Sequence, residues 1–362
     1  METSPLVERV QDLTDLELAI LLSLVAGEHC IIQTEGSALE SLEQELRLVA
    51  SNLFGLSHAV VHCDESTTGE DFSDGILVEN ENHRRINHDY VENGRNSEHD
   101  PSRRDRSKSS VEEEVGQDDQ SIANIVIITG LPNANNDIQI QALELLRTRR
   151  MFTHTAVHSA PKAFLLIFLN DVDGTRLTHH LNDHIFISHY HDPEDGFANL
   201  EEGSEWIEDD RASLSSVVHR SVTQNALSPS QPTILTQEEI QTLKTRTQTT
   251  TISTEVKTYL HNIITFLRLH RAVAGGISPL ATTHFNLLAK CLAPLHGLSF
   301  VTPSLIALAA RKIYPHRITI TSPENERSMQ YGSDLEAVKA ILEGVRPEDV
   351  IEDVLVQVEA PL

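Results

Sequence analysis

The sequence predicts an α/β domain, with a parallel sheet between layers of helices, followed by an all-α helical bundle. Three observations lead to this fold class. Short β-rich runs alternate with amphipathic helical patterns in the first half of the chain, as they do in parallel sheets. From about residue 236 the apolar spacing is helical. The charge also inverts there, since residues 236–320 hold nine Lys and Arg but only three Asp and Glu.

The elements of the first half follow one another through short turns. Thr14 and Glu17 have the spacing of a capping box, just before an apolar run. The predicted elements of the α/β domain are a helix over 6–25, a strand over 29–34, a helix over 37–54, strands over 58–63 and 125–128, a helix over 136–150 and a strand over 164–169. Strand, helix, strand is the βαβ pattern of a parallel sheet.

The second half is predicted to be helical. Apolar residues at helical spacing indicate bundle helices over 256–267, 287–295 and 305–313, and further helices over 333–342 and 348–358. Gly275 and Gly276 lie between two bundle helices, and we interpret them as a helix C-cap and turn. The opposite charges of the two halves suggest that they dock; the alternative is two separately solvated surfaces.

Two segments interrupt these patterns. Residues 79–121 contain twelve Asp and Glu, seven Lys and Arg and almost nothing apolar, so we predict a disordered acidic insertion. The stretch Asp192–Asp210 holds nine acids without Lys or Arg, and Ser, Thr, Gln and Pro dominate from there to residue 235. We therefore expect an α/β domain over 1–200, a linker over 201–235, a helical domain over 236–320 and a helical extension over 321–362.

The composition excludes several classes of protein. The 362 residues include 54 Asp and Glu against 28 Lys and Arg, a formal net charge of −26, which argues against a nucleic-acid-binding protein. No apolar run approaches the ~18 residues of a membrane span, and the acidic start resembles no leader peptide. Cys30, Cys63 and Cys291 are too far apart for a disulfide framework or zinc ribbon. We expect a soluble protein of the cytoplasm or nucleus.

Five histidines between His179 and His191 raise the question of a zinc site. His179, His184 and His189 are five residues apart, which is neither the spacing of a helical HxxxH pair nor that of a zinc finger. Since the chain has 19 histidines, surface histidines are the simpler interpretation. We therefore expect no metal site.

The segment 275–309 carries a family resemblance. It begins G-G-I-S-P-L-A and ends G-L-S-F-V-T-P-S-L-I-A-L-A. This resembles the lid of the magnesium-chelatase ATPase subunit and its AAA+ relatives, whose pattern is G-x-S-P-R-A, a helix, then G-x-x-[FY]-V-x-P-x-D-[VI]. The stretch 138–170 resembles the same family between its Walker B strand and its sensor 1 Asn. The overall similarity is greatest to the magnesium-chelatase-like proteins of fungi. The resemblance implies an AAA+-like α/β domain with a helical lid.

The resemblance also implies a nucleotide site, whose first motif is degenerate here. A P-loop reads G-x-x-x-x-G-K-[ST], because glycine N–H groups and a lysine hold the phosphates. After the first predicted strand this chain has Gly36 and Ser37 but no lysine, and the first Lys in the sequence is Lys108. Glu35 and Glu40 would repel a polyphosphate.

The remaining motifs of the family are also altered. The Walker B strand should end in Asp-Glu, which binds Mg²⁺ and orients water, but the strand over 125–128 runs into Thr129 and Gly130. Asn170 matches the sensor 1 position. At three positions the family's arginine is replaced by another residue: Leu280 (sensor 2), Thr178 and His184. These losses predict no catalytic residue and no bound cofactor or metal.

The sequence therefore supports three hypotheses. The first is a non-catalytic pseudo-ATPase that acts through protein–protein interaction, with other proteins, including AAA+-type subunits, as partners, and with room for ring-like oligomers. The alternative is an active chelatase-type enzyme that uses ATP and Mg²⁺ at a divergent site. The third, an AAA+ protein associated with nucleic acid, is weakened by the net charge. The missing phosphate lysine separates the first two.

Overall fold

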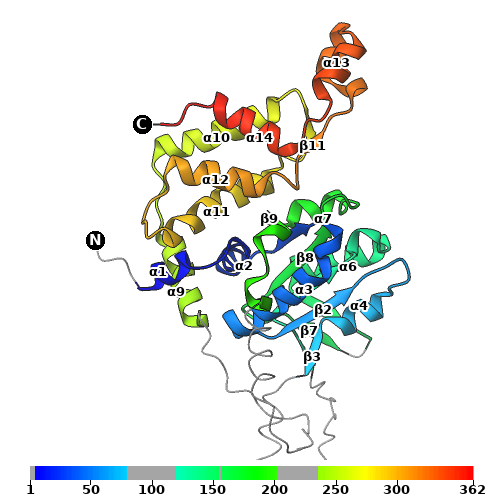
Figure 1. Cartoon of the computed structure of the whole chain (residues 1–362), viewed down its shortest axis with the longest axis vertical. Helices are drawn as coiled ribbons and strands as arrows, with labels where there is room; N and C mark the ends of the chain where they lie inside the picture. Colours follow the sequence, from blue (N-terminus) through cyan, green and yellow to red (C-terminus); the bar gives the residue numbers. More distant parts are fainter. Residues whose placement is uncertain (1–4, 80–119, 155, 202–234, 362) are drawn as a thin grey trace, which may run out of the picture.

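The computed structural model describes residues 5–79, 120–154, 156–201 and 235–361 (Figure 1). Nearly all of the predicted acidic insertion (79–121) and linker (201–235) lies outside these ranges. The two flanks of the insertion are close together, since β3 (Leu77–Glu79) and β4 (Gln120–Ile122) pair as an antiparallel ribbon.

A five-stranded parallel sheet forms the centre of the α/β part. Its order is β2-β5-β8-β1-β9. The strands are β1 (Cys30–Thr34), β2 (His58–His62), β5 (Ile125–Thr129), β8 (Leu165–Asp171) and β9 (Ile187–Tyr190). Every neighbouring pair is parallel, and Ile167 at the centre is in register with both Cys30 of β1 and Ile127 of β5. The sheet and the helices around it confirm the predicted α/β fold class, a parallel sheet between layers of helices.

Helices cover both faces of the sheet, and the strand alternation decides which residues meet which layer. Ile125 and Ile127 belong to one apolar cluster, and Val126 and Ile128 to the other. The first cluster includes residues of α2 (Asp15–Ala26) and α3 (Leu39–Leu48). The second includes residues of α4 (Gly69–Gly75), α6 (Asn136–Thr148) and α7 (His179–His184).

The helix predicted over 6–25 is two helices, α1 (Pro5–Gln11) and α2. The capping box was correctly identified from the sequence, and it explains the break. The Thr14 hydroxyl accepts from the Glu17 N–H at 3.3 Å, and Glu17 Oε2 accepts from the Thr14 N–H at 2.9 Å. A capping box satisfies N–H groups that have no partner at a helix start, so it begins a new helix and does not lie inside one.

Helix α2 is apolar on all sides because it is buried on all sides. Nine of its twelve residues are buried, among them Leu21 and Ile20. It contacts β1 and β9 on the sheet and α9 (Gln237–Thr249) and α11 (Pro279–Leu295) of the lid. In Figure 1 it lies between the sheet and the helical part. A helix without a polar face fits such a position between two layers.

The second half is a helical lid. Besides α9 and α11 it contains α10 (Thr254–Leu269) and α12 (Pro303–Ile313), and it is followed by short 3₁₀ turns and by α13 (Leu335–Leu342) and α14 (Pro347–Gln357). The predicted amphipathic helices are thus confirmed. One apolar cluster runs from α3 and the sheet through α2 into the lid and α14, so the two halves dock. No helix in the described ranges is long and apolar enough to cross a membrane.

The interpretation of Gly275 and Gly276 as a helix C-cap is wrong. Gly275 ends a short strand, β10 (Val273–Gly275), which pairs with β11 (Thr319–Ile320). Gly276 has φ +100°, and a Cβ there would lie 1.9 Å from the carbonyl oxygen of Arg317. The glycine therefore permits a close approach between two segments of backbone.

Replacing Leu21 by Ala should lower the free energy of unfolding by about 2–5 kcal/mol, since Leu21 is fully buried in α2. Because α2 touches both sheet and lid, we expect one cooperative transition in denaturant, shifted as a whole. Val356→Ala, at an 84 % exposed residue, should change stability by less than about 0.5 kcal/mol. Separate unfolding of lid and sheet in the L21A variant would contradict the role given to α2.

The two adjacent glycines offer a second, matched test. Gly276→Ala should destabilise the fold by more than about 1 kcal/mol, because alanine meets both the positive φ and the Arg317 carbonyl. Gly275→Ala should be tolerated, since nothing lies within 4 Å of a Cβ at that position. Thermal unfolding of the two variants compares them directly, and equal shifts would contradict the assigned contact.

Candidate functional site

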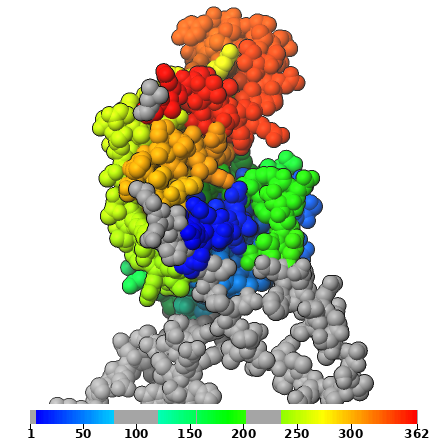
Figure 2. All heavy atoms as spheres, turned by 60° about the vertical axis from the view of Figure 1, so that its left-hand side comes forward, coloured from blue at the N-terminus to red at the C-terminus, as the bar shows by residue number. Residues whose placement is uncertain are grey.

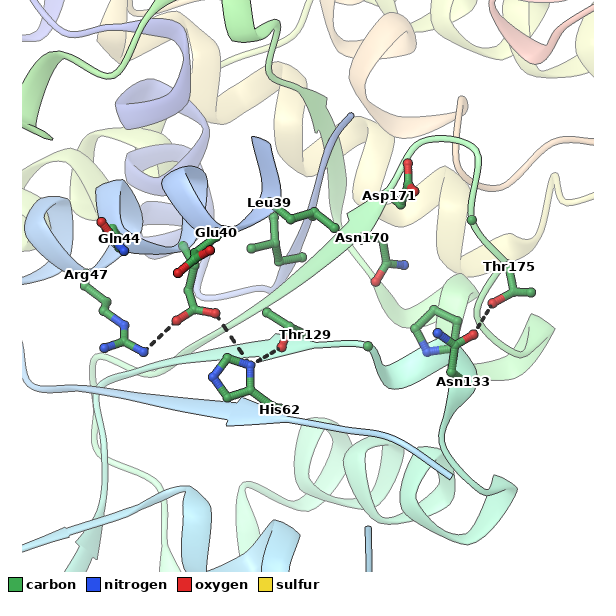
Figure 3. Close-up of a pocket in the computed structure, with 15 residues that line it drawn as sticks. Leu39, Glu40, Gln44, Arg47, His62, Thr129, Asn133, Asn170, Asp171 and Thr175 are labelled. Atoms are coloured by element: carbon green, nitrogen blue, oxygen red, sulfur yellow. Dashed lines mark hydrogen bonds and ion pairs between the residues drawn. The ribbon is translucent and has the colours of Figure 1, made fainter. Parts of the chain in front are cut away.

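A cavity of about 570 Å³ lies at the carboxyl ends of β2, β5 and β8, beside α3 (Figure 3). In α/β proteins with open sheets, ligands bind in this crevice. Thr129, Gly130 and Asn170, three of the positions singled out from the sequence, line it. The other polar lining residues are Glu40, Glu43, Gln44, Arg47, His62, Asn133, Asp171 and Thr175. Ser37 and Leu280, also singled out from the sequence, are not part of this lining.

The connection from β1 to α3 is a tight turn. Only residues 35–38 separate the two elements, and Gly36–Ala38 already form a 3₁₀ turn that continues into the helix. A P-loop needs about eight residues to wrap its N–H groups around phosphate. Ser37 is exposed in this turn. The turn is therefore too short for a loop of that kind.

A carboxylate lies against the glycine of this turn. A Cβ on Gly36 would be 2.9 Å from Oδ2 of Asp171, at the end of β8. Asp171 is in register with Thr34 on β1, and its Oδ1 accepts from the N–H of Asp173 at 3.2 Å. The acid is thus held beside the backbone that a phosphate would have to approach.

Glu43, a buried residue of α3, connects a small polar network on one wall of the cavity. Its Oε1 accepts from Arg47 at 2.5 Å, and its Oε2 is 3.6 Å from Nδ1 of His62. The same His62 nitrogen is 2.7 Å from the hydroxyl of Thr129 (Figure 3). Thr129 ends β5, where the family resemblance implies the acidic pair. A histidine and a threonine hydroxyl therefore meet at that position.

Asn170, near the end of β8, and Gly130, directly after β5, have different roles. Asn170 is 7 % exposed, and its Oδ1 has no hydrogen-bond partner among the described residues. Gly130 has φ +69°, and a Cβ there would lie 2.3 Å from the carbonyl oxygen of Cys63. Gly130 therefore serves the packing of β5 against the end of β2, whereas Asn170 lines the cavity with its buried Oδ1 unpaired among the described residues.

The lid contacts α7 through a set of polar bonds that we call the lid latch, made by Asp183, Ile185, Ser278, His316 and Arg317. The Ser278 hydroxyl donates to Oδ1 of Asp183 at 2.6 Å. Arg317 donates to the backbone carbonyls of Asp183, at 3.2 Å, and of Ile185. His316 Nε2 is 3.1 Å from the same Ile185 carbonyl. These carbonyls lie at the C-terminal end of α7, where a cation is favoured.

Arg317 is only 3 % exposed, and burial lowers its pKa to about 10. Its NH2 group is 2.6 Å from Nδ1 of His284, which must accept this bond in its neutral form. Burial lowers the pKa of His284 to about 3, which agrees with a neutral ring. Arg317 therefore donates to neutral acceptors, the two carbonyls and the His284 ring, and the nearby Asp183 carboxylate favours its charged form.

Three family arginine positions take up other roles here. Thr178 precedes α7, and its N–H donates to Gln139 at 3.0 Å. His184 ends α7, and burial lowers its pKa. Leu280 is half-buried in the first turn of α11, two residues after the latch serine Ser278. None of the three supplies a charge to the cavity.

The histidines of 179–191 do not form a metal centre in the described part of the chain, where no group of three or more His, Cys, Asp or Glu side chains could hold a metal ion. The interpretation as surface histidines is wrong for His189 and His191, which are 4 % and 7 % exposed. Burial lowers the pKa of His189 to about 3.

Sequence reasoning missed Asp171, Glu43 and His62 as members of the cavity. A helical i, i+4 pair, Glu43 with Arg47, was visible in the sequence. Strand alternation also places His62 on the same sheet face as Val60. Nothing local indicated that Asp171 would lie against Gly36, because 134 intervening residues separate them in the chain.

Comparisons with known proteins agree with this architecture. Residues 265–338 match the family model of the AAA lid domain. A crystal structure of a protein from Cytophaga hutchinsonii ATCC 33406, described as a "putative ATPase", is similar with a TM-score of 0.61 and 14 % identity, over 99 % of this chain and 94 % of that chain. At this identity the likeness concerns the fold.

A curated relative matches a smaller part of the chain. The similarity to Maintenance of telomere capping protein 2 of Kluyveromyces lactis is 30 % identity over 92 residues. This match covers 24 % of the chain and only about a third, 34 %, of that protein. Together the matches give this protein an AAA+-like α/β fold with an AAA lid.

The buried histidines predict sensitivity to acid. Burial lowers the pKa of His29, His189 and His284 to about 3, and it also lowers the pKa of His316 well below its usual value. Between pH 6.5 and 3 the unfolded chain therefore binds more protons at these sites than the folded chain. The free energy of unfolding should fall as pH falls through this window, by up to about 1.4 kcal/mol per pH unit for each such histidine.

His29→Gln isolates one of these contributions. Its Nδ1 accepts from the Leu166 N–H at 3.0 Å, so the variant will be less stable, but the pH slope of its stability is an independent reading. We expect the slope between pH 6 and 4 to decrease by about one proton in urea titrations. His261→Gln, at an exposed position on α10, is the control. An unchanged slope in H29Q would contradict a neutral, buried His29.

Proposed function

We propose that this AAA+-like protein is a pseudo-ATPase that does not hydrolyse ATP and acts by binding other proteins. The observation that most supports the proposal is the tight turn after β1, where the Asp171 carboxylate lies against Gly36. A phosphate bound there would have to displace an anion and would find too few backbone N–H groups. The fold resembles that of an ATPase module, but a carboxylate occupies the position where phosphate would approach the turn.

The charges around the turn also oppose a polyphosphate. Glu40, Glu43 and Asp171 line the cavity, and Arg47 already contacts Glu43 at 2.5 Å. Two like charges 4 Å apart repel by about 4 kcal/mol at an effective dielectric constant of about 20. No lysine precedes Lys108, so none is available on α3 to neutralise phosphate.

The groups that would carry out hydrolysis are replaced as well. Phosphoryl transfer needs carboxylates for Mg²⁺ and for orienting water, and an arginine finger is worth roughly 10³–10⁵ in rate. At the end of β5 the chain has Thr129, whose hydroxyl is 2.7 Å from His62. At the lid position where the family has its sensor 2 arginine, the chain has Leu280. These substitutions support loss of turnover even if nucleotide were to bind.

The lid latch supports a lid that does not respond to nucleotide. Arg317 and Ser278 fix the lid to α7 through bonds that involve no ligand. The apolar cluster through α2 reinforces the same arrangement. A lid held in this way suits a rigid binding module better than a switch driven by hydrolysis.

The lid and the C-terminal elements offer surface for a protein partner. They carry several large apolar side chains that are between 42 % and 87 % exposed: Phe266, Leu269, Phe300, Tyr331, Ile341 and Val356. Aromatic side chains, such as the two phenylalanines and the tyrosine of this set, are enriched in protein interfaces. We expect the partner, including any AAA+-type subunit, to contact this part.

We place the protein in the cytoplasm or nucleus. The printed name of the Kluyveromyces lactis relative concerns the maintenance of telomere capping, and it favours the nucleus within this proposal. Partners in such a process would be other proteins, since the net charge of −26 opposes direct binding to nucleic acid.

Isothermal titration of the full chain with Mg²⁺ and ATP tests the proposal. We expect no saturable binding below millimolar ATP and no phosphate release. Leu280→Arg should not restore hydrolysis, because the lysine and the acids remain absent. A micromolar dissociation constant, or turnover in L280R, would overturn the proposal in favour of the active chelatase-type enzyme.

A further inference from the structure

The cavity beside α3 is lined by hydrogen-bond acceptors, and its excess charge is negative. We name it the acceptor cavity and define it by Glu40, Glu43, Thr129, Asn170 and Asp171. We propose that it binds a small organic cation that carries a guanidinium or primary ammonium group. The inference rests on the proposed function, because the carboxylates that would attract a cation are the ones that we take to oppose a polyphosphate.

The charge balance of the lining is the first support. Three carboxylates line the cavity, from Glu40, Glu43 and Asp171, against one guanidinium, from Arg47, which leaves an excess of two negative charges. Arg47 is committed to Glu43 at 2.5 Å. Glu40 and Asp171 therefore remain to pair with a cation that enters from solvent.

Asn170 is an independent support. The residue is 93 % buried, since only 7 % of its surface is exposed, and its Oδ1 has no donor among the described residues. Figure 3 shows its amide directed toward the space between Thr129 and Asn133. A buried carbonyl oxygen without a donor is unfavourable, and an N–H group of a ligand would satisfy it.

Size and geometry favour an organic cation over a metal ion. The cavity volume, about 570 Å³, falls in the range of small-molecule sites. In the described part of the chain no three metal-ligating side chains come close enough to hold an ion. A guanidinium presents five N–H donors in a plane, and an ammonium presents three, so either can bridge acceptors that are spread along a wall.

The test is a pair of titrations of the full chain, one with agmatine, which carries both a guanidinium and an ammonium group, and one with Mg²⁺ and ATP. We expect saturable agmatine binding that weakens as salt is raised. A blocked peptide with a central arginine is a third titrant. If the peptide binds more tightly than agmatine, the cation that the cavity binds is an arginine side chain of another protein. The same acceptors of the cavity would hold its guanidinium group.

Matched variants connect binding to the cavity. Glu40→Gln and Asp171→Asn should each weaken agmatine binding about tenfold, because each removes one carboxylate charge. Glu144→Gln, at an exposed glutamate on α6 outside the cavity, should leave it unchanged. Thermal unfolding of each variant checks that it is folded.

The outcomes separate the two proposals. No saturable binding of agmatine or peptide, or binding that E40Q and D171N leave unchanged, overturns the acceptor cavity but not the pseudo-ATPase. Micromolar ATP binding overturns both. Agmatine binding without ATP binding, lost in the two cavity variants alone, supports both.

Discussion

The rest of the structure depends on the burial of α2 between the sheet and the lid. Its sides contact β1 and β9 on one layer and α9 and α11 on the other, so a single apolar helix belongs to two cores at once. Apolar burial of about 25 cal/mol per Å² is the dominant favourable term in folding. Helix α2 precedes every strand in the sequence, and the lid follows them all. The contacts of α2 with α9 and α11 therefore join two segments that the strands separate in the chain.

Because this shared core already joins the lid to the α/β part, the polar contacts between them act on a preformed interface. Arg317 and His316 are buried where the lid meets α7, and their bonds to the Ile185 carbonyl orient a lid that apolar contact already holds. Buried polar pairs of this kind specify geometry more than they add stability.

The carboxyl edge of the sheet, where open α/β proteins bind ligands, carries side chains that differ from those of the resembling family. Thr129 and Asn170 end neighbouring strands beside α3, and Asp171 takes up the space over Gly36. Thr129 stands where the family has carboxylates, Asn170 keeps the family's residue, and Asp171 adds a negative charge beside Gly36. The backbone arrangement that places ligands at this edge is retained, and under our two proposals the charge of the ligand that it favours is reversed.

The sequence by itself determined the fold class, most of the strands and helices, and the capping box at Thr14, because these follow from local spacing and hydrogen bonding. It did not indicate β9, whose residues Ser188 and His189 are polar but buried. Only the tertiary structure decided that Gly276 serves a close backbone contact, that His189 is neutral and buried, and that Asp171 lies against Gly36. Such facts depend on residues distant in the chain, which pattern and spacing do not relate.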